Sequence, residues 1–347
     1  MKQKCNYTSI GGSALIEGVM MRSPQKTAIA VRRERGDIVL KVTENQKSNP
    51  IINKIPIIRG LVSFVMSMKL SYSSMMYAAD VAMEDIQEEF EPESKLDKFL
   101  DKLLGKTGMA ILGVFAMVIG VLMGVGLFFA LPTLIVNFVT GLFDGFAALS
   151  EGARRVITSL GEGVIKMAVF LCYLVLISMM KDIKRVFQYH GAEHKSIFCF
   201  EAGKELCPEN ARNFKRFHPR CGTSFMFLTI LVSIVISTLI TTDNVWMRAG
   251  IRICLLPVMM GLAYECIRLA GKYDNVFTRI LSAPGMYFQR LTTKEPDQSQ
   301  LEVAIAALNG VLKEYPLDTE LILTEDGYKL KEEKNDESTA QSRSEEC

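Results

Sequence analysis

The most informative part of the sequence is GMAILGVFAMVIGVLMGVGLFFALPTLIVNF at residues 108–138, where 31 consecutive residues carry no charged side chain. About 20 apolar residues in a helix are enough to cross a bilayer, so this stretch predicts an integral membrane protein. Pro132 removes a helical hydrogen bond and marks a kink or the end of the first span. We expect that span at about 109–132, followed by a partly amphipathic outer segment at 134–163.

Three further apolar runs follow. A second span is expected at about 164–180 (VIKMAVFLCYLVLISMM), with Lys166 near one end, and a third at about 224–241. A weaker fourth span is expected at about 249–265, since it contains Arg252. A buried helix of a soluble domain is a plausible alternative for the fourth run, but it explains the first and third poorly. The expected fold is mainly α, a polytopic membrane protein with about four transmembrane helices.

The basic residues indicate how the spans are oriented. Residues 181–223 carry nine lysines and arginines, whereas residues 134–163 carry two and residues 242–248 carry one. Cytosolic loops of membrane proteins are enriched in basic residues, so we expect 181–223 and both termini in the cytosol. The first residues lack the long apolar region of a signal peptide. The prediction is a multi-pass protein of the cell inner (cytoplasmic) membrane.

The remaining segments are soluble in character. Residues 27–44 (TAIAVRRERGDIVLKVTE) predict a β-hairpin, because β-branched runs flank a polar turn that contains glycine. The expected organisation is an N-terminal β-containing region (1–48), an interfacial or packed amphipathic helix (49–83), an acidic linker (84–106), the transmembrane bundle (107–270), a C-terminal cytosolic region (271–325) with an amphipathic helix at 297–313, and a disordered tail (326–347).

Net charge and cysteine spacing argue against two classes of protein. The formal net charge is only +2, so nothing indicates a nucleic-acid partner. The eight cysteines show no CxxC spacing, and they do not resemble a disulfide framework. The lipid bilayer is therefore the first partner that the sequence predicts.

All three histidines of the chain fall within 29 residues, between the second and third spans. His190 and His194 occur in YHGAEHK, with Glu193 between them. Residues four apart share one face of a helix, which is how two imidazoles reach one metal ion. The HxxEH spacing is typical of the inverted zinc peptidases, where the glutamate is the general base. The sequence therefore predicts a divalent-metal site, with zinc as the favoured ion and Glu193 as the catalytic base.

A catalytic zinc site has a third protein ligand and an open position. His218 and Cys221 are the nearest candidates, since they directly precede the third span. Glu17 and Glu265 are the carboxylate candidates for a further ligand or an orienting group. A simpler interpretation stays open. Histidines at a helix end can contact headgroups or cap carbonyls, and His218 can belong to a turn before the span.

Five blocks of the sequence resemble the YqhQ-like family of uncharacterised bacterial membrane proteins, which are described as predicted metal-dependent enzymes. The resemblance covers roughly residues 9–310 and implies a bacterial inner-membrane protein, but it implies no substrate. One departure is Ser13, where the family pattern leads us to expect glutamine. The blocks are GGSALIEGVMMRSP, YHGAEHKSIFCFEAG, FHPRCGTSFMF, LAYECIRLAG and LTTKEPDQSQLEVAIAAL.

Three functions follow, in descending order of support. The first is a membrane-embedded metal-dependent hydrolase at the cytosolic membrane face, which acts on a peptide bond of a membrane protein or on a lipid-linked ester. The second is a non-enzymatic membrane scaffold, or an assembly or stress factor, that binds partners through its N-terminal hairpin and the helix at 298–313. The third is a transporter or channel. It is disfavoured because the first and third spans hold no ionisable residue, and such residues usually mark a transport path.

Overall fold

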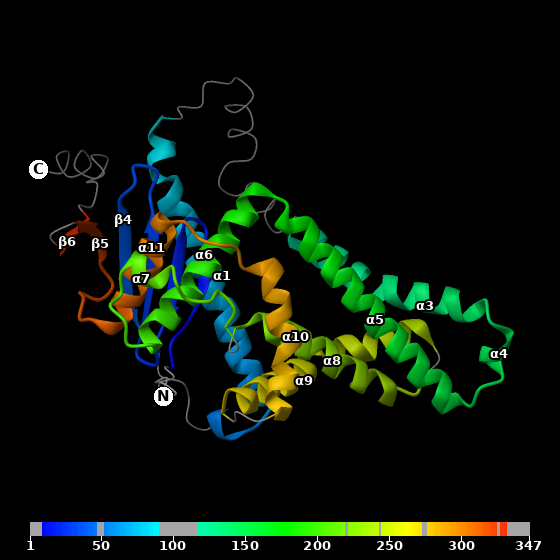
Figure 1. The fold of residues 1–347 in the computed structure, drawn as a ribbon. Helices are drawn as coiled ribbons and strands as arrows, with labels where there is room; N and C mark the ends of the chain where they lie inside the picture. Colours follow the sequence, from blue (N-terminus) through cyan, green and yellow to red (C-terminus); the bar gives the residue numbers. More distant parts are fainter. Residues whose placement is uncertain are drawn as a thin grey trace, which may run out of the picture.

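The computed structural model describes residues 9–46, 52–89, 115, 117–218, 221–242, 244–272, 276–324 and 327–331. It consists of a β-sheet with helices on both faces and an elongated bundle of helices that extends away from the sheet (Figure 1). Most of the acidic linker predicted at 84–106, and the tail beyond residue 331, lie outside the described residues.

The sheet has six antiparallel strands in sequence order. The predicted hairpin at 27–44 is confirmed as β3 and β4, with Arg32 paired to Ile38. The last two strands come from the other end of the chain: β5 pairs with β4, and β6 pairs with β5 and lies within the stretch that the sequence predicts as a disordered tail. The strands are β1 (Gly11–Leu15), β2 (Gly18–Arg22), β3 (Lys26–Arg32), β4 (Ile38–Glu44), β5 (Glu320–Thr324) and β6 (Gly327–Leu330).

Helices cover both faces of the sheet, so its central strands are apolar at successive positions. Side chains alternate between the two faces of a strand. Val19 and Met21 pack on one side with α6 (Lys181–Glu201) and α11 (Gln298–Leu312), and Met20 packs on the other side with α1 (Ile58–Glu89). The C-terminal helix expected at 297–313 is therefore a core helix, with ten of its fifteen residues buried.

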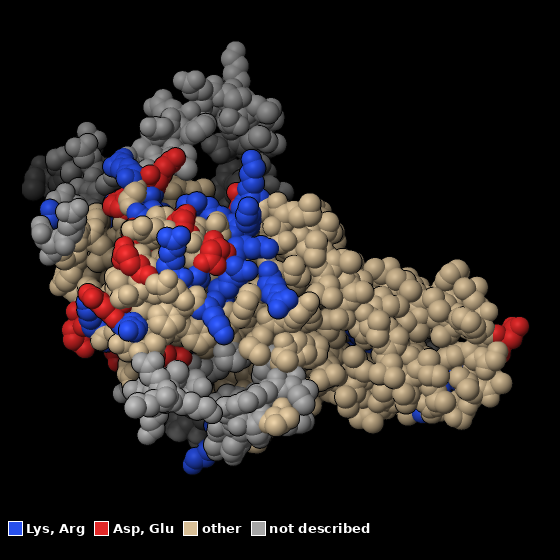
Figure 2. All heavy atoms as spheres, in the orientation of Figure 1, with Lys and Arg blue, Asp and Glu red and all other residues tan. Residues whose placement is uncertain are grey.

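The bundle is mainly α-helical, as predicted. Three helices are long and apolar enough to cross a membrane, namely Met117–Gly141, Glu151–Ser178 (α5) and Met247–Leu269 within α9. Figure 2 shows that charged side chains gather over the sheet, whereas the bundle surface in this view is almost uncharged. The other elements are η1 (Ile52–Lys54), η2 (Gly126–Ala130), α3 (Leu131–Gly141), α4 (Asp144–Ala147), α7 (Pro208–Ala211), α8 (Thr223–Leu239), α9 (Val245–Lys272) and α10 (Val276–Thr292).

Two of these helices are longer than the spans that the sequence predicts for them. The first continues through Pro132 to Gly141, because the π-helical turn η2 directly precedes the proline and accommodates its missing N–H. The second begins at Glu151, where the Ser150 side chain caps it, rather than near residue 164. Lys166 therefore lies in the middle of α5 and not near one end of a span.

Candidate metal centre

Helix α6 carries the predicted motif across one face of the sheet. Tyr189 and Ala192 pack into the core, and this orients His190 and His194 toward the segment that precedes α8. Gly191 allows a close approach at the same level, since a Cβ there would lie 2.1 Å from the Lys294 carbonyl oxygen. The helix is therefore held tightly against the chain that follows α10.

The structure brings three of the predicted ligands together. One ligand atom from each of His190, His194 and Cys221 lies within 4.8 Å of the other two. His190 Nε2 is 3.2 Å from Cys221 Sγ, and the two imidazole centroids are 4.5 Å apart. Tetrahedral zinc with bonds of about 2.0–2.3 Å places its ligand atoms roughly 3.3–3.7 Å apart. The three side chains need only small adjustments to reach that geometry.

Backbone carbonyls hold both imidazoles in the orientation that metal binding requires. His190 Nδ1 donates to the Thr292 carbonyl at 2.9 Å, and His194 Nδ1 donates to the Arg216 carbonyl at 2.5 Å. These acceptors have no hydrogen to give, so they assign the proton to Nδ1 in each ring. The Nε2 lone pairs are left for a ligand, as in metal sites whose histidines are fixed by an outer hydrogen bond.

Glu193 lies beside this cluster and is almost completely buried, with 4% exposure. Burial raises the pKa of its carboxyl to about 7, although His190 and a hydrogen bond from the Gly12 N–H act in the opposite direction. Its Oε2 has no hydrogen-bond partner among the described residues. The carboxyl group therefore has one oxygen anchored to β1 and one available for a proton.

His218 lies near the cluster but outside the group of three. Its backbone N–H and carbonyl are both bonded to the Gln289 side chain of α10, at 2.7 and 2.8 Å. Its ring lies 5.5 Å from the His194 ring and 4.7 Å from the Phe198 ring, centroid to centroid. Of the two candidates for the third ligand, Cys221 is the one that joins the pair on α6.

The two carboxylate candidates are bound elsewhere. Glu17, in the turn between β1 and β2, forms an ion pair with Arg185 and accepts a hydrogen bond from Tyr189. Glu265, on α9, forms an ion pair with Arg59 of α1. Neither belongs to the histidine–cysteine group, and each has a structural role in joining two elements.

Sequence reasoning missed the residues that support the ligands. Thr292 and the Arg216 carbonyl orient the histidines, and Glu295 bonds both Lys195 and Arg216 beside them. The block LTTKEPDQ contains Thr292 and Glu295 and is part of the family resemblance. That resemblance is the one feature of the sequence that could have pointed to these two residues. Backbone acceptors leave no other mark on a sequence.

A cavity of about 630 Å³ lies between β1 and α1. It reaches from β1 to the residue that follows Cys221, and small or hydroxyl-bearing side chains form much of its wall. These residues include Gly11, Gly12, Ser13, Ser67, Ser71 and Gly222. Of these residues, Gly12 bonds Glu193 through its N–H and Gly222 follows Cys221, so one edge of the cavity lies near the cluster.

Comparison with known proteins gives a family but no activity. The family model described as "Protein of unknown function (DUF1385)" matches residues 55–314. The chain is also 34% identical to the "Uncharacterized protein YqhQ" of Bacillus subtilis (strain 168) over 313 residues, which cover 87% of this chain and 92% of the relative. No solved structure matches it. The YqhQ-like resemblance is confirmed, and the comparisons add nothing on metal or reaction.

Proposed function

This chain belongs to the DUF1385 family, and we propose that it is a membrane-embedded, metal-dependent hydrolase acting at the cytosolic membrane face. The observation that carries the proposal is the convergence of His190, His194 and Cys221, with both Nε2 lone pairs directed by backbone hydrogen bonds. Two imidazoles and a thiolate form a ligand set that suits zinc.

The proposed roles follow from the chemistry of each group. A bound zinc ion supplies Lewis-acid chemistry, which polarises a carbonyl and activates water. Three protein ligands leave a fourth position open for substrate or water. Glu193 would receive the proton of the attacking water and return it to the leaving group. Gly12 supports this role, because its N–H holds one oxygen of that carboxyl group.

We further propose a four-span topology with cytosolic termini. In addition to the three long apolar helices, this topology needs α8 as a span, which corresponds to the span predicted at 224–241. Its apolar part, Phe225–Leu239, is shorter than those three helices. Its 17 residues rise about 25 Å, somewhat less than a hydrocarbon core of about 30 Å. The basic residues of α6 and the following loop favour the cytosol for the sheet and the metal centre.

The substrate class follows from this position. The proposed centre lies where α5 and α8 meet the part of the chain that contains the sheet. A hydrolase at this position acts on substrates at the inner membrane surface. We propose a peptide bond in a membrane protein or an ester linked to a lipid. The cavity beside Gly12 and Gly222 would receive it.

Metal content and turnover test the proposal in the purified full chain. We expect near-stoichiometric zinc in the wild type, and loss of zinc in His194→Ala and Cys221→Ser. Cys207→Ser is the matched control, since Cys207 is also partly buried and lies outside the cluster. Glu193→Gln should keep the zinc but hydrolyse a fluorogenic peptide or a short-chain lipid ester about 10²–10⁴-fold more slowly. Wild-type protein without a bound transition metal would contradict the proposal.

The scaffold alternative has less support. One of its two docking surfaces was the helix at 298–313, and that helix is packed into the core as α11. Its buried apolar face is therefore not available to a partner. Glu193→Gln separates the two functions, because a scaffold that binds through its ends should tolerate this change.

A further inference from the structure

The membrane bundle contains a second cluster of polar residues, remote from the histidines. Arg252 of α9 forms an ion pair with Glu162 of α5, and both side chains are at most 3% exposed. Thr133 of α3 donates a hydrogen bond to the same carboxylate at 3.0 Å. Charges at membrane depth are costly, and they usually mark a functional site.

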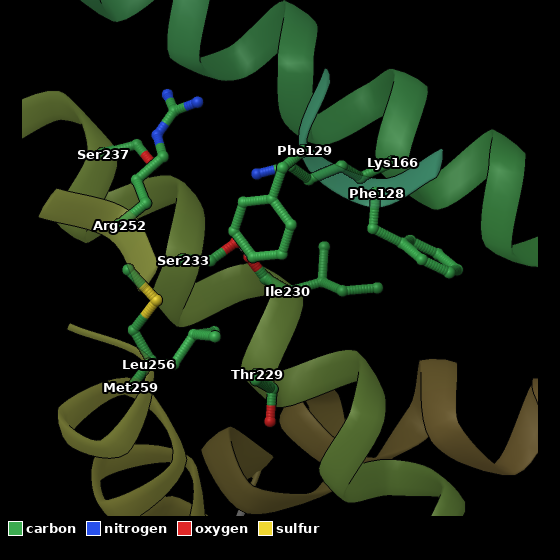
Figure 3. Close-up of a pocket in the computed structure, with 10 residues that line it drawn as sticks. All are labelled: Phe128, Phe129, Lys166, Thr229, Ile230, Ser233, Ser237, Arg252, Leu256 and Met259. Carbon is green, nitrogen blue, oxygen red and sulfur yellow. Dashed lines mark hydrogen bonds between the residues drawn. The ribbon is translucent and has the colours of Figure 1, made fainter. Parts of the chain in front are cut away.

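A cavity of about 170 Å³ lies next to this ion pair, where four helical segments meet (Figure 3). The wall comes from η2, α5, α8 and α9, and most of it is apolar. Its polar side chains include Lys166, Ser237 and Arg252. One water needs only about 10–15 Å³ of such space, so the cavity has room for a group of several heavy atoms.

Lys166 lacks a counter-ion in this cavity. Its side chain is 7% exposed, and no described residue accepts a hydrogen bond from its ammonium group. The ammonium lies 5.3 Å from the centre of the Phe129 ring. Glu162 is the carboxylate in its neighbourhood, but Arg252 and Thr133 already occupy that group. A buried ammonium without an anion is unfavourable, because it loses its hydration and gains no ionic partner in return.

A second polar group in the same wall is also unsatisfied. The Ser237 hydroxyl is buried and has no hydrogen-bond partner among the described residues. The hydroxyl of Ser233 differs, because it donates to the Ile230 carbonyl at 2.7 Å. The cavity therefore offers one unpaired cation and one free hydroxyl donor, surrounded by apolar side chains. This set complements an anion that carries oxygen acceptors.

We propose that this cavity binds a phosphate group, either the headgroup phosphate of a lipid or free phosphate. The site lies toward the end of the bundle that is far from the sheet, since Arg252 is only seven residues, about 10 Å, from the start of α9. Lys166 provides the charge, Ser237 donates a hydrogen bond, and the apolar wall contacts the remainder of a lipid. The site is separate from the metal centre, so it does not depend on the proposed hydrolase.

Ligand-dependent stability tests this site in the delipidated full chain in detergent. Sodium phosphate and dioctanoyl phosphatidylglycerol are added separately, and the unfolding midpoint is followed. A ligand that binds the folded state raises the midpoint with its concentration. A response to the lipid alone identifies a headgroup, and a response to sodium phosphate identifies free phosphate. No response to either probe overturns the proposal.

Two variants and one control assign the response to the cavity. Lys166→Met should abolish the shift, and removal of an unpaired buried charge is compatible with folding. Ser237→Ala should weaken the response about tenfold through loss of one charge-assisted hydrogen bond, and it tests the site independently if the first variant folds poorly. Lys181→Met, at an exposed position at the start of α6, should respond as the wild type does. A wild-type response in Lys166→Met would also overturn the proposal.

Discussion

Gly12 sets the distance between the first strand and the Glu193 carboxyl group. A Cβ at this position would lie 2.5 Å from the Met20 carbonyl oxygen and 3.0 Å from Glu193 Cδ. The backbone of β1 cannot move away without breaking its pairing with β2, in which Gly12 faces Met21. A methyl group therefore has to displace either the strand or the carboxyl group.

We predict that Gly12→Ala lowers the free energy of unfolding by about 1–3 kcal/mol, the usual cost of overpacking a well-packed site. Gly11→Ala is the matched control, since it lies in the same strand and a Cβ there would meet nothing within 4 Å. Denaturant unfolding of both variants measures the difference. Equal stabilities for the two variants would show that β1 does not approach Glu193 this closely.

The sequence predicts the two histidine ligands, but it does not predict the hydrogen bonds that position the residues around them. HxxEH spacing predicted that His190 and His194 share a helix face, because helical geometry is local. The choice between His218 and Cys221 depended on Gln289, which holds the backbone of His218 from 71 residues away. Pairings over such distances leave no periodic signal in a single sequence.

Among the elements, α11 has the best-defined start. Asp297 accepts a hydrogen bond from the Gln300 N–H at 2.8 Å, and the Gln300 side chain accepts one from the Asp297 N–H at 3.0 Å. This reciprocal pair is a capping box. It fixes the first turn of a helix that packs on the sheet beside α6.

We predict that Asp297→Ala lowers the free energy of unfolding by about 1 kcal/mol. Asp297→Asn should retain nearly all of the stability, because an amide oxygen accepts the same hydrogen bond from the Gln300 N–H. The comparison of the two variants by denaturant unfolding isolates the cap from the loss of charge. A large loss in the asparagine variant would mean that the negative charge, rather than the hydrogen bond, stabilises the helix start.

Other elements show why sequence patterns placed some boundaries and missed others. The hairpin of β3 and β4 was predicted because its turn and its strands are contiguous. Strands β5 and β6 were missed, since β5 pairs with β4 across about 280 residues and β6 pairs only with β5. The predicted second span begins later than α5 because Glu162 and the charged residues before it suggest contact with water, whereas in the structure Glu162 is buried.

In the whole molecule, the candidate metal centre lies where the sheet and its covering helices meet the helical bundle. His190 and His194 belong to α6, which packs on the sheet, and Cys221 directly precedes α8 of the bundle. The histidines also bond two further segments, through Thr292 at the end of α10 and Arg216 before α8. A metal ion bound at this point would therefore link the sheet to the membrane helices.

This arrangement predicts that removal of the metal destabilises the whole protein and not only the site. Chelation should lower the unfolding midpoint, and added zinc should restore it. A ligand at a hundred times its dissociation constant contributes about 2.7 kcal/mol to the free energy of unfolding.

In Cys221→Ser both responses should be small, while Cys207→Ser should behave as the wild type. Performing the chelation with the calcium salt of EDTA excludes an effect of magnesium or calcium loss. A wild-type midpoint that responds neither to the chelator nor to zinc would leave the sheet and the bundle joined by packing alone, and the histidine–cysteine cluster would then have no role in holding them together.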